Sequence, residues 1–149
     1  MEVPDYEYIV DQFGNRFWKL DGEYHREDGP AVIWGDGRVE YYWRGKLHRE
    51  DGPAVIKPND YEEWWFRDRR HRIEGPAVTF VNGGEEWWVN GLTHRNDGPA
   101  VTYDNGNIEW YIDNIRIFDS EQFRRRSGLS DEAMTILILK YGEWCNGQF

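Results

Sequence analysis

The sequence contains few of the side chains that carry out covalent chemistry. There is one cysteine, Cys145, so no internal disulfide can form and the fold must be stabilised by packing. The serines are Ser120, Ser127 and Ser130, all in a C-terminal stretch with helical character. Since no histidine lies near Cys145 in the sequence, neither residue type indicates a site for acyl transfer.

Long apolar runs and an excess of positive charge are also missing. The mean hydropathy is −0.89, and no run is long enough for a transmembrane helix or a signal peptide. We therefore expect a cytoplasmic protein without membrane contact. The 28 acidic and 18 basic side chains give a formal charge of −10, which disfavours general binding to nucleic acid or anionic lipid.

Aromatic side chains, in contrast, are abundant. The chain has 9 Trp, 9 Tyr and 7 Phe together with 16 Gly, a mixture that favours strands and tight turns over helices. The histidines recur every 23 residues, and each begins a related segment: His25 and His48 begin HREDGPAV, His71 begins HRIEGPAV and His94 begins HRNDGPAV. The same interval joins Trp18, Tyr41, Trp64, Trp87 and Trp110. The chain therefore contains five repeat units, of which the first is incomplete.

Each repeat unit predicts a β-hairpin. After the GPA tripeptide come a short β-branched or aromatic run, a turn, and a second strand such as Glu85 to Val89. The turns contain Asp36-Gly37, Asn82-Gly83 or Asn105-Gly106, pairs that accept the positive φ angles of a type I′ turn. The second strands end at residues that tolerate a left-handed backbone, namely Gly22, Gly45, Asp68, Gly91 and Asn114.

Five hairpins predict a mainly β fold, a single antiparallel meander of ten strands over residues 1–117. Residues 118–149 lose the repeat and predict a helical C-terminal cap. Asp119 or Ser120 can cap a short helix that ends at Arg126, and Ser130 can cap a second helix over about 130–141. Because the second helix is apolar nearly all round, we expect it to be buried. The chain is then a monomer, or a dimer formed through this helix.

The repeat resembles a known family. The segment WWVNGLTHRNDGPAVTYDNG at 87–106 is similar to the membrane occupation and recognition nexus (MORN) repeat, and the HREDGPA core resembles variant arrays of tailed phages and large DNA viruses. The resemblance covers about residues 8–117. It implies a β-hairpin array that serves as an interaction scaffold, in a phage or viral accessory protein of the host cytoplasm. Here an arginine and an acid follow the histidine where the ordinary repeat has glycine, so no lipid-binding role is carried over.

Strand alternation divides the side chains between two faces of the sheet. One face is apolar in every unit and is expected to form the core. Because exposed aromatics would aggregate, we expect the C-terminal helices to cap this face on the last hairpins. It carries Trp18 and Leu20, Tyr41 and Trp43, Trp64 and Phe66, Trp87 and Val89, and Trp110 and Ile112. The other face is expected to be solvated, with an aromatic stripe beside a ladder of glutamates, Glu40, Glu63, Glu86 and Glu109.

Neither the histidines nor the glutamates predict a metal or catalytic site. Equivalent residues of successive units lie about 9.6 Å apart, too far to share one zinc ion at about 2.1 Å. We expect Arg26, Arg49, Arg72 and Arg95 to pair with Asp28, Asp51, Glu74 or Asp97, and each histidine to bond to backbone at the GPA turn. The glutamates of successive units are separated by nearly the same distance as the two catalytic carboxylates of an inverting glycosidase, about 6.5–9.5 Å. An acid–base pair needs two carboxylates with different pKa values, and four glutamates in equivalent environments do not provide this difference. We therefore predict that the protein is not an enzyme and has no cofactor.

Binding is the class of function that remains. The stripe Tyr42, Trp65, Trp88 and Tyr111, flanked by Glu63, Glu86 and Glu109, suits lysine or arginine side chains of a basic partner, or serves cross-strand packing alone. An alternative anion site for a nucleotide or nucleotide-derived signal consists of Arg67, Arg69, Arg70, His71 and Arg72. The prediction is a non-catalytic protein–protein interaction module that docks on a host protein; the alternatives are the nucleotide binder and an acidic DNA mimic.

Overall fold

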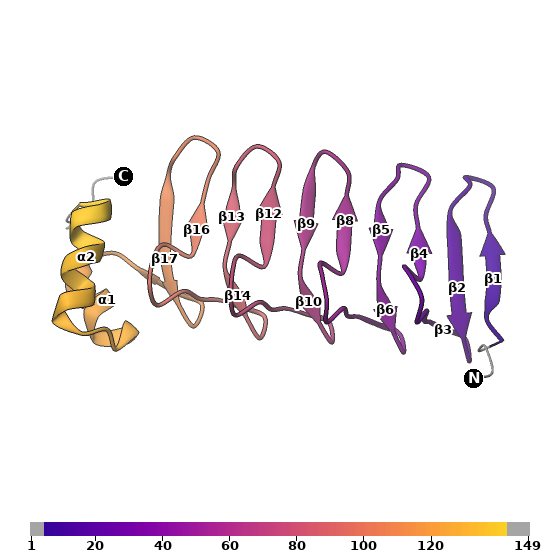
Figure 1. The fold of residues 1–149 in the computed structure, drawn as a ribbon, viewed down its shortest axis with the longest axis horizontal. Helices are drawn as coiled ribbons and strands as arrows, with labels where there is room; N and C mark the ends of the chain where they lie inside the picture. Colours follow the sequence, from indigo (N-terminus) through magenta and orange to yellow (C-terminus); the bar gives the residue numbers. More distant parts are fainter. Residues whose placement is uncertain (1–4, 143–149) are drawn as a thin grey trace.

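In a computed structural model that describes residues 5–142, five antiparallel hairpins stand side by side along the molecule (Figure 1). Their strands are β1 (Glu7–Val10) and β2 (Arg16–Leu20), β4 (Val32–Ile33) and β5 (Val39–Glu40), β8 (Val55–Lys57) and β9 (Tyr61–Glu63), β12 (Val78–Phe80) and β13 (Glu85–Glu86), and β16 (Val101–Thr102) and β17 (Ile108–Ile112). Each strand pairs with its neighbours in chain order. The predicted meander of β-hairpins is confirmed.

The segment before each histidine forms additional short strands that the sequence analysis missed. These are β3 (Glu23–Tyr24), β6 (Tyr42–Trp43) with β7 (Lys46–Leu47), β10 (Trp65–Phe66) with β11 (Arg69–Arg70), β14 (Trp88–Val89) with β15 (Leu92–Thr93), and β18 (Ile115–Ile117). The repeated aromatic residue lies where the chain passes from the main sheet into the small hairpin. The Tyr41 N–H donates to the Ala54 carbonyl at 2.7 Å, and the Tyr41 carbonyl accepts from the His48 N–H at 3.0 Å.

The turn types differ from the prediction. Asp36 does not have a positive φ, whereas Gly37 has φ of 87° and its N–H donates to the Trp34 carbonyl at 3.0 Å. This is the loop in which a type I turn is followed by a left-handed glycine. The type I′ geometry occurs instead in the small hairpins, where both central residues have positive φ, as in Arg44 (47°) and Gly45 (73°). The prediction of a left-handed backbone at Gly45 and its equivalents is confirmed.

The interior of the sheet is made of small side chains from the GPAV segment. Ala31, Ala54, Ala77 and Ala100 have no exposed surface, and Val32, Val55 and Val78 are buried. Because four of the five units each contain one Ala-Val pair, this part of the core is a thin line along the array rather than one central cluster. This arrangement is typical of a repeat protein whose units contact mainly their neighbours.

The two predicted helices are confirmed. Helix α1 (Ser120–Ser127) begins after Asp119, whose carboxylate accepts from the Gln122 N–H at 2.7 Å. Helix α2 (Asp131–Tyr141) begins after Ser130, whose hydroxyl accepts from the Ala133 N–H at 3.3 Å. Both lie at the C-terminal end of the row of hairpins (Figure 1). No helix within residues 5–142 is both long enough and apolar enough to cross a membrane.

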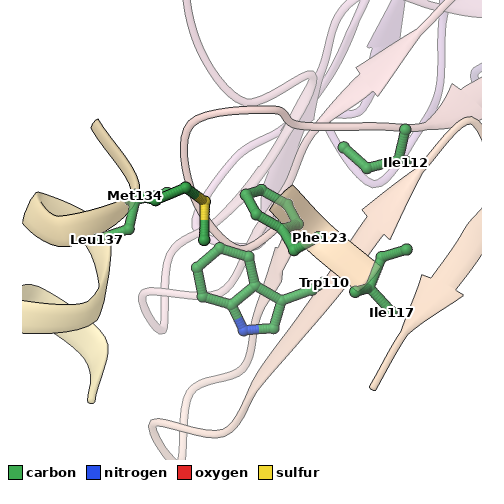
Figure 2. Packing of buried hydrophobic residues seen from close by; sticks show 6 residues of the cluster. All are labelled: Trp110, Ile112, Ile117, Phe123, Met134 and Leu137. Carbon is green, nitrogen blue, oxygen red and sulfur yellow. The ribbon is translucent and has the colours of Figure 1, made fainter. Parts of the chain in front are cut away.

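The helices cover the end of the array (Figure 1), which confirms the predicted cap on the last hairpins. Figure 2 shows Met134 of α2 pointing toward the rings of Trp110 and Phe123, and the ring centroids of Trp110 and Phe123 are 4.8 Å apart. The expectation that α2 is buried nearly all round is wrong, since Ile136 and Leu139 are 59 % and 81 % exposed. One hairpin offers only enough apolar surface for one side of the helix.

The assignment of a core face and a solvated face also needs correction. Trp43 and Phe66, expected in the core, are 43 % and 40 % exposed because they lie in the small hairpins beyond the main sheet. Glu40, expected to be solvated, is only 8 % exposed. Strand alternation therefore holds for the direction of side chains but not for their burial.

Candidate functional site

An arginine clamp at each of the four His-Arg pairs explains most of the HREDGPA motif. The guanidinium of Arg49 lies 4.0 Å from the ring of Tyr41, donates to Asp51 at 2.8 Å, and donates to the Pro53 carbonyl at 3.2 Å. Its other side faces Gly52, where a Cβ would lie 2.9 Å from the arginine Cζ. The ring, the carboxylate and the carbonyl hold the guanidinium in place, and the glycine leaves room for it.

The clamp repeats along the array and covers the aromatic residues that the helices do not reach. Arg26 lies on Trp18 at 4.2 Å, Arg72 on Trp64 at 4.2 Å and Arg95 on Trp87 at 3.8 Å. The predicted ion pairs are present for Arg26 with Asp28, Arg49 with Asp51 and Arg95 with Asp97. The third unit differs, since the described residues Arg72 and Glu74 form no ion pair and the Arg72 guanidinium donates to the Pro76 carbonyl at 3.1 Å. Ile117 and Phe118 stand where the next His-Arg pair would be, and there the rings of Phe123 and Tyr141 cover Trp110 instead.

The histidines also act within the fold. His25 is 1 % exposed, and its Nδ1 atom accepts from the Arg44 N–H at 3.0 Å. His71 and His94 accept in the same way from the turn residues 19 positions later, at 3.0 and 3.2 Å. The expected contact with the GPA turn is therefore wrong, because the histidine bonds to the type I′ turn of the following hairpin. His48 differs, since its buried Nδ1 atom has no hydrogen-bond partner.

Within residues 5–142 no group of three or more His, Cys, Asp or Glu side chains is placed to hold a metal ion. Cys145 lies outside the described residues. The glutamates Glu40, Glu63, Glu86 and Glu109 all have partners within the chain.

Arg70 lies at the centre of the glutamate face, the side of the sheet that carries Glu40, Glu63, Glu86 and Glu109. Trp65 donates its indole N–H to Glu63 at 2.6 Å, and Trp88 donates its indole N–H to Glu86 at 2.8 Å. The guanidinium of Arg70 lies 5.3 Å from each of the two rings and pairs with Glu63 at 2.8 Å and Glu86 at 3.7 Å. The chain's own arginine thus takes the place that the sequence analysis assigned to a partner's arginine.

The outer members of this face are also engaged. The Tyr42 hydroxyl donates to Glu40 at 3.1 Å and the Tyr111 hydroxyl donates to Glu109 at 3.0 Å, and both glutamates pair with arginines. Burial, assisted by the Glu40 charge, raises the pKa of Tyr42. The predicted binding set Tyr42, Glu63, Trp65, Glu86, Trp88, Glu109 and Tyr111 lies along one side of the sheet, but its carboxylates already have partners.

The predicted arginine cluster does not line one pocket. Arg69 and Arg70 lie beside Trp65 and Trp88. His71 and Arg72 line a groove with Trp64, and Arg67 lines another groove farther toward the N-terminus. Strand alternation separates these residues, because Trp64 and Trp65 point to opposite sides of the sheet.

Two grooves of equal size lie on the clamp side, which is the side of the sheet where the clamp arginines cover the repeated aromatic rings. Each groove has a volume of about 590 Å³. The first groove contains Arg26, Glu27, Tyr41, Trp43, His48 and Arg49. The second groove contains Arg49, Glu50, Trp64, Phe66, His71 and Arg72. Each residue of the second list stands 23 positions after its counterpart, so the same groove occurs in two successive units and the two share a wall at Arg49 and Glu50.

The grooves combine exposed rings with acidic side chains. Glu27 and Glu50 are 54 % and 80 % exposed and lie 3.7 and 3.6 Å from the Nε2 atoms of His25 and His48. Trp43 and Phe66 are the exposed rings. Arg67 is the one exposed arginine within these two grooves, and its guanidinium lies 5.4 Å from the ring of Phe66.

The exposed rings and exposed glutamates of the grooves lie at positions that vary between units. In the later units Ile73 and Asn96 follow the His-Arg pair in place of Glu27 and Glu50, and Val89 and Ile112 stand where Trp43 and Phe66 do. Strand alternation places Trp43 and Phe66 in the core and therefore does not predict these grooves. The available signal was the position of these rings next to the type I′ turn.

No protein-family model matches the chain, and no curated protein matches it. The similarity to the MORN repeat therefore stays a prediction from the motif.

Proposed function

We propose that this protein is a non-catalytic binding module that holds a basic segment of a partner protein in the first and second grooves. The observation that carries the proposal is the recurrence of one groove in two successive units, each with an exposed ring and an exposed glutamate. Aromatic rings and carboxylates together suit lysine and arginine side chains. The HREDGPA-type repeat makes a host protein the first partner to test for a phage or viral accessory protein.

The geometry favours the grooves over the glutamate face. A cation from a partner would have to displace Arg70 from Glu63 and Glu86, whereas Glu27 and Glu50 remain exposed. The dispersal of the arginine cluster over three separate places weighs against a nucleotide site there.

Partner capture with matched variants tests the proposal. We expect Trp43→Ala combined with Phe66→Ala to abolish capture of a partner from host lysate, because aromatic anchors commonly carry most of the binding energy of an interface. The control is Val89→Ala combined with Leu92→Ala, which changes exposed or half-exposed apolar residues of the fourth unit.

A second pair of variants compares the two sides of the sheet. Trp65→Ala combined with Trp88→Ala should leave capture unchanged, after circular dichroism confirms that each variant is folded. If the groove variants retain the partner and the Trp65 and Trp88 variants lose it, the grooves are not the binding site.

A further inference from the structure

We infer that the segment bound in the grooves is a polyproline II helix with a lysine or arginine at every third position. This inference rests on the proposed function and adds the conformation and spacing of the ligand. The inference depends on the observation that the two grooves are equivalent and adjacent. A ligand whose side chains recur at the separation of the grooves can therefore place the same kind of side chain in both.

The spacing of the grooves selects the backbone of the ligand. The grooves are one repeat apart, which is two strands, and strands in a sheet lie about 4.8 Å apart, so the grooves are about 9.6 Å apart. A polyproline II helix rises about 3.1 Å per residue with three residues per turn, so equivalent side chains recur about every 9.3 Å. In a β-strand, side chains on the same side recur about every 6.7 Å, and in an α-helix residues seven apart are separated by about 10.5 Å. Both distances differ more from the groove separation than the polyproline II repeat does.

The chemistry of the grooves selects the side chain. Each clamp arginine is already held on a ring, and Arg26 and Arg49 are also bound to Asp28 and Asp51. The exposed carboxylates of Glu27 and Glu50 are therefore available to a cation that lies against Trp43 or Phe66. Proline rings between the cations add apolar contact with the same aromatic side chains, as in other grooves that bind polyproline II segments.

One residue opposes this ligand: Arg67 lines the first groove and lies against the aromatic ring of the second groove. Arg67 has its guanidinium 5.4 Å from the Phe66 ring and occupies a position that a ligand cation would use. Its φ of 48° is also unfavourable for an arginine, and the equivalent residue of the fourth unit is Asn90. Arg67→Asn should therefore strengthen binding without loss of stability.

The test compares two peptides of identical composition by fluorescence anisotropy at fixed salt. One is (Arg-Pro-Pro)4 and the other is (Arg-Arg-Pro-Pro-Pro-Pro)2, and both form polyproline II helices. We expect the period-three peptide to bind about tenfold more tightly, because only it places arginines in both grooves at once. Equal affinities would mean attraction of charge alone and would overturn the inference.

Variants of the protein locate the binding. Glu27→Gln with Glu50→Gln should abolish the preference for the period-three peptide, whereas Glu121→Gln with Glu132→Gln changes the net charge equally on the helices and should retain it. Arg67→Asn should increase the affinity several-fold; a loss of affinity would contradict the inference. An alanine-based helical peptide with arginines seven residues apart should bind no better than the irregular peptide, and tighter binding of it would also overturn the inference.

The two proposals fail in different ways. If partner capture requires Trp43 and Phe66 but the peptides bind equally, the ligand conformation is wrong and the proposed function stands. If capture does not require these rings, both are wrong.

Discussion

Replacing Gly98 by alanine tests the arginine clamp on which the repeat depends. A Cβ at this position would lie 2.8 Å from Cζ of Arg95, while the backbone of Gly98 is not in the left-handed region and accepts alanine. The guanidinium is the end of a flexible side chain, so it can move aside. The cost is then the loss of its contact with Trp87, at 3.8 Å, and of its bond to Asp97, at 2.7 Å.

The size of the effect follows mainly from these two contacts, because the third bond of the guanidinium, to the Pro99 carbonyl, is longer at 3.3 Å. A cation–π contact contributes about 0.5–2 kcal/mol, and an ion pair with an exposed carboxylate contributes at most about 1 kcal/mol. We therefore expect Gly98→Ala to lower the free energy of unfolding by about 1–2 kcal/mol. Urea titration followed by circular dichroism measures this change.

A double-mutant cycle separates the clamp from a general effect of the substitution. Without Arg95 nothing needs to move, so Gly98→Ala in the Arg95→Ala background should be neutral or should stabilise by about 0.4–1 kcal/mol through the unfolded chain. If the two substitutions are additive, Gly98 does not act through Arg95 and the explanation of the motif is refuted.

Three further predictions concern the cap, the histidines and an exposed carboxylate. Phe123→Ala should cost about 3–5 kcal/mol in urea unfolding because its ring is fully buried; a cost below 1 kcal/mol or so would contradict the packing of the cap. His25→Leu should cost about 1–3 kcal/mol because it leaves a turn N–H unpaired, and His48→Leu should cost less, since its Nδ1 atom has no partner. The hydrogen bond from Arg26 holds the pKa of Asp28 below its ordinary 3.8, so the stability due to this pair is present above that pH and is lost as the pH falls through the lower folded value. Arg26→Ala should return the pKa of Asp28 toward 3.8 in an NMR titration, and an unchanged pKa would exclude this cause.

The hairpins and the helix caps could be predicted from the sequence because they depend on local signals. The interval of 23 residues sets the hairpin register, and Asp119 and Ser130 begin helices through their own side chains.

Burial could not be predicted because it depends on contacts between units. Glu40 is buried by partners that include Tyr42 and Trp34, and no alternation rule reveals those bonds. Trp43 is exposed because the small hairpin leaves the main sheet after Tyr41, which strand periodicity does not show. Strand alternation therefore predicts the stripe on the glutamate side and does not predict the grooves beside Trp43 and Phe66.

The central claim is that the partner binds on the clamp side of the sheet, and the indole N–H signals of the tryptophans report on it directly. A 1H–15N NMR titration with the captured partner should shift the Trp43 indole signal and leave those of Trp65 and Trp88 in place, because the latter two donate to Glu63 and Glu86 on the opposite side. Shifts confined to Trp65 and Trp88, with Trp43 unchanged, would contradict the claim.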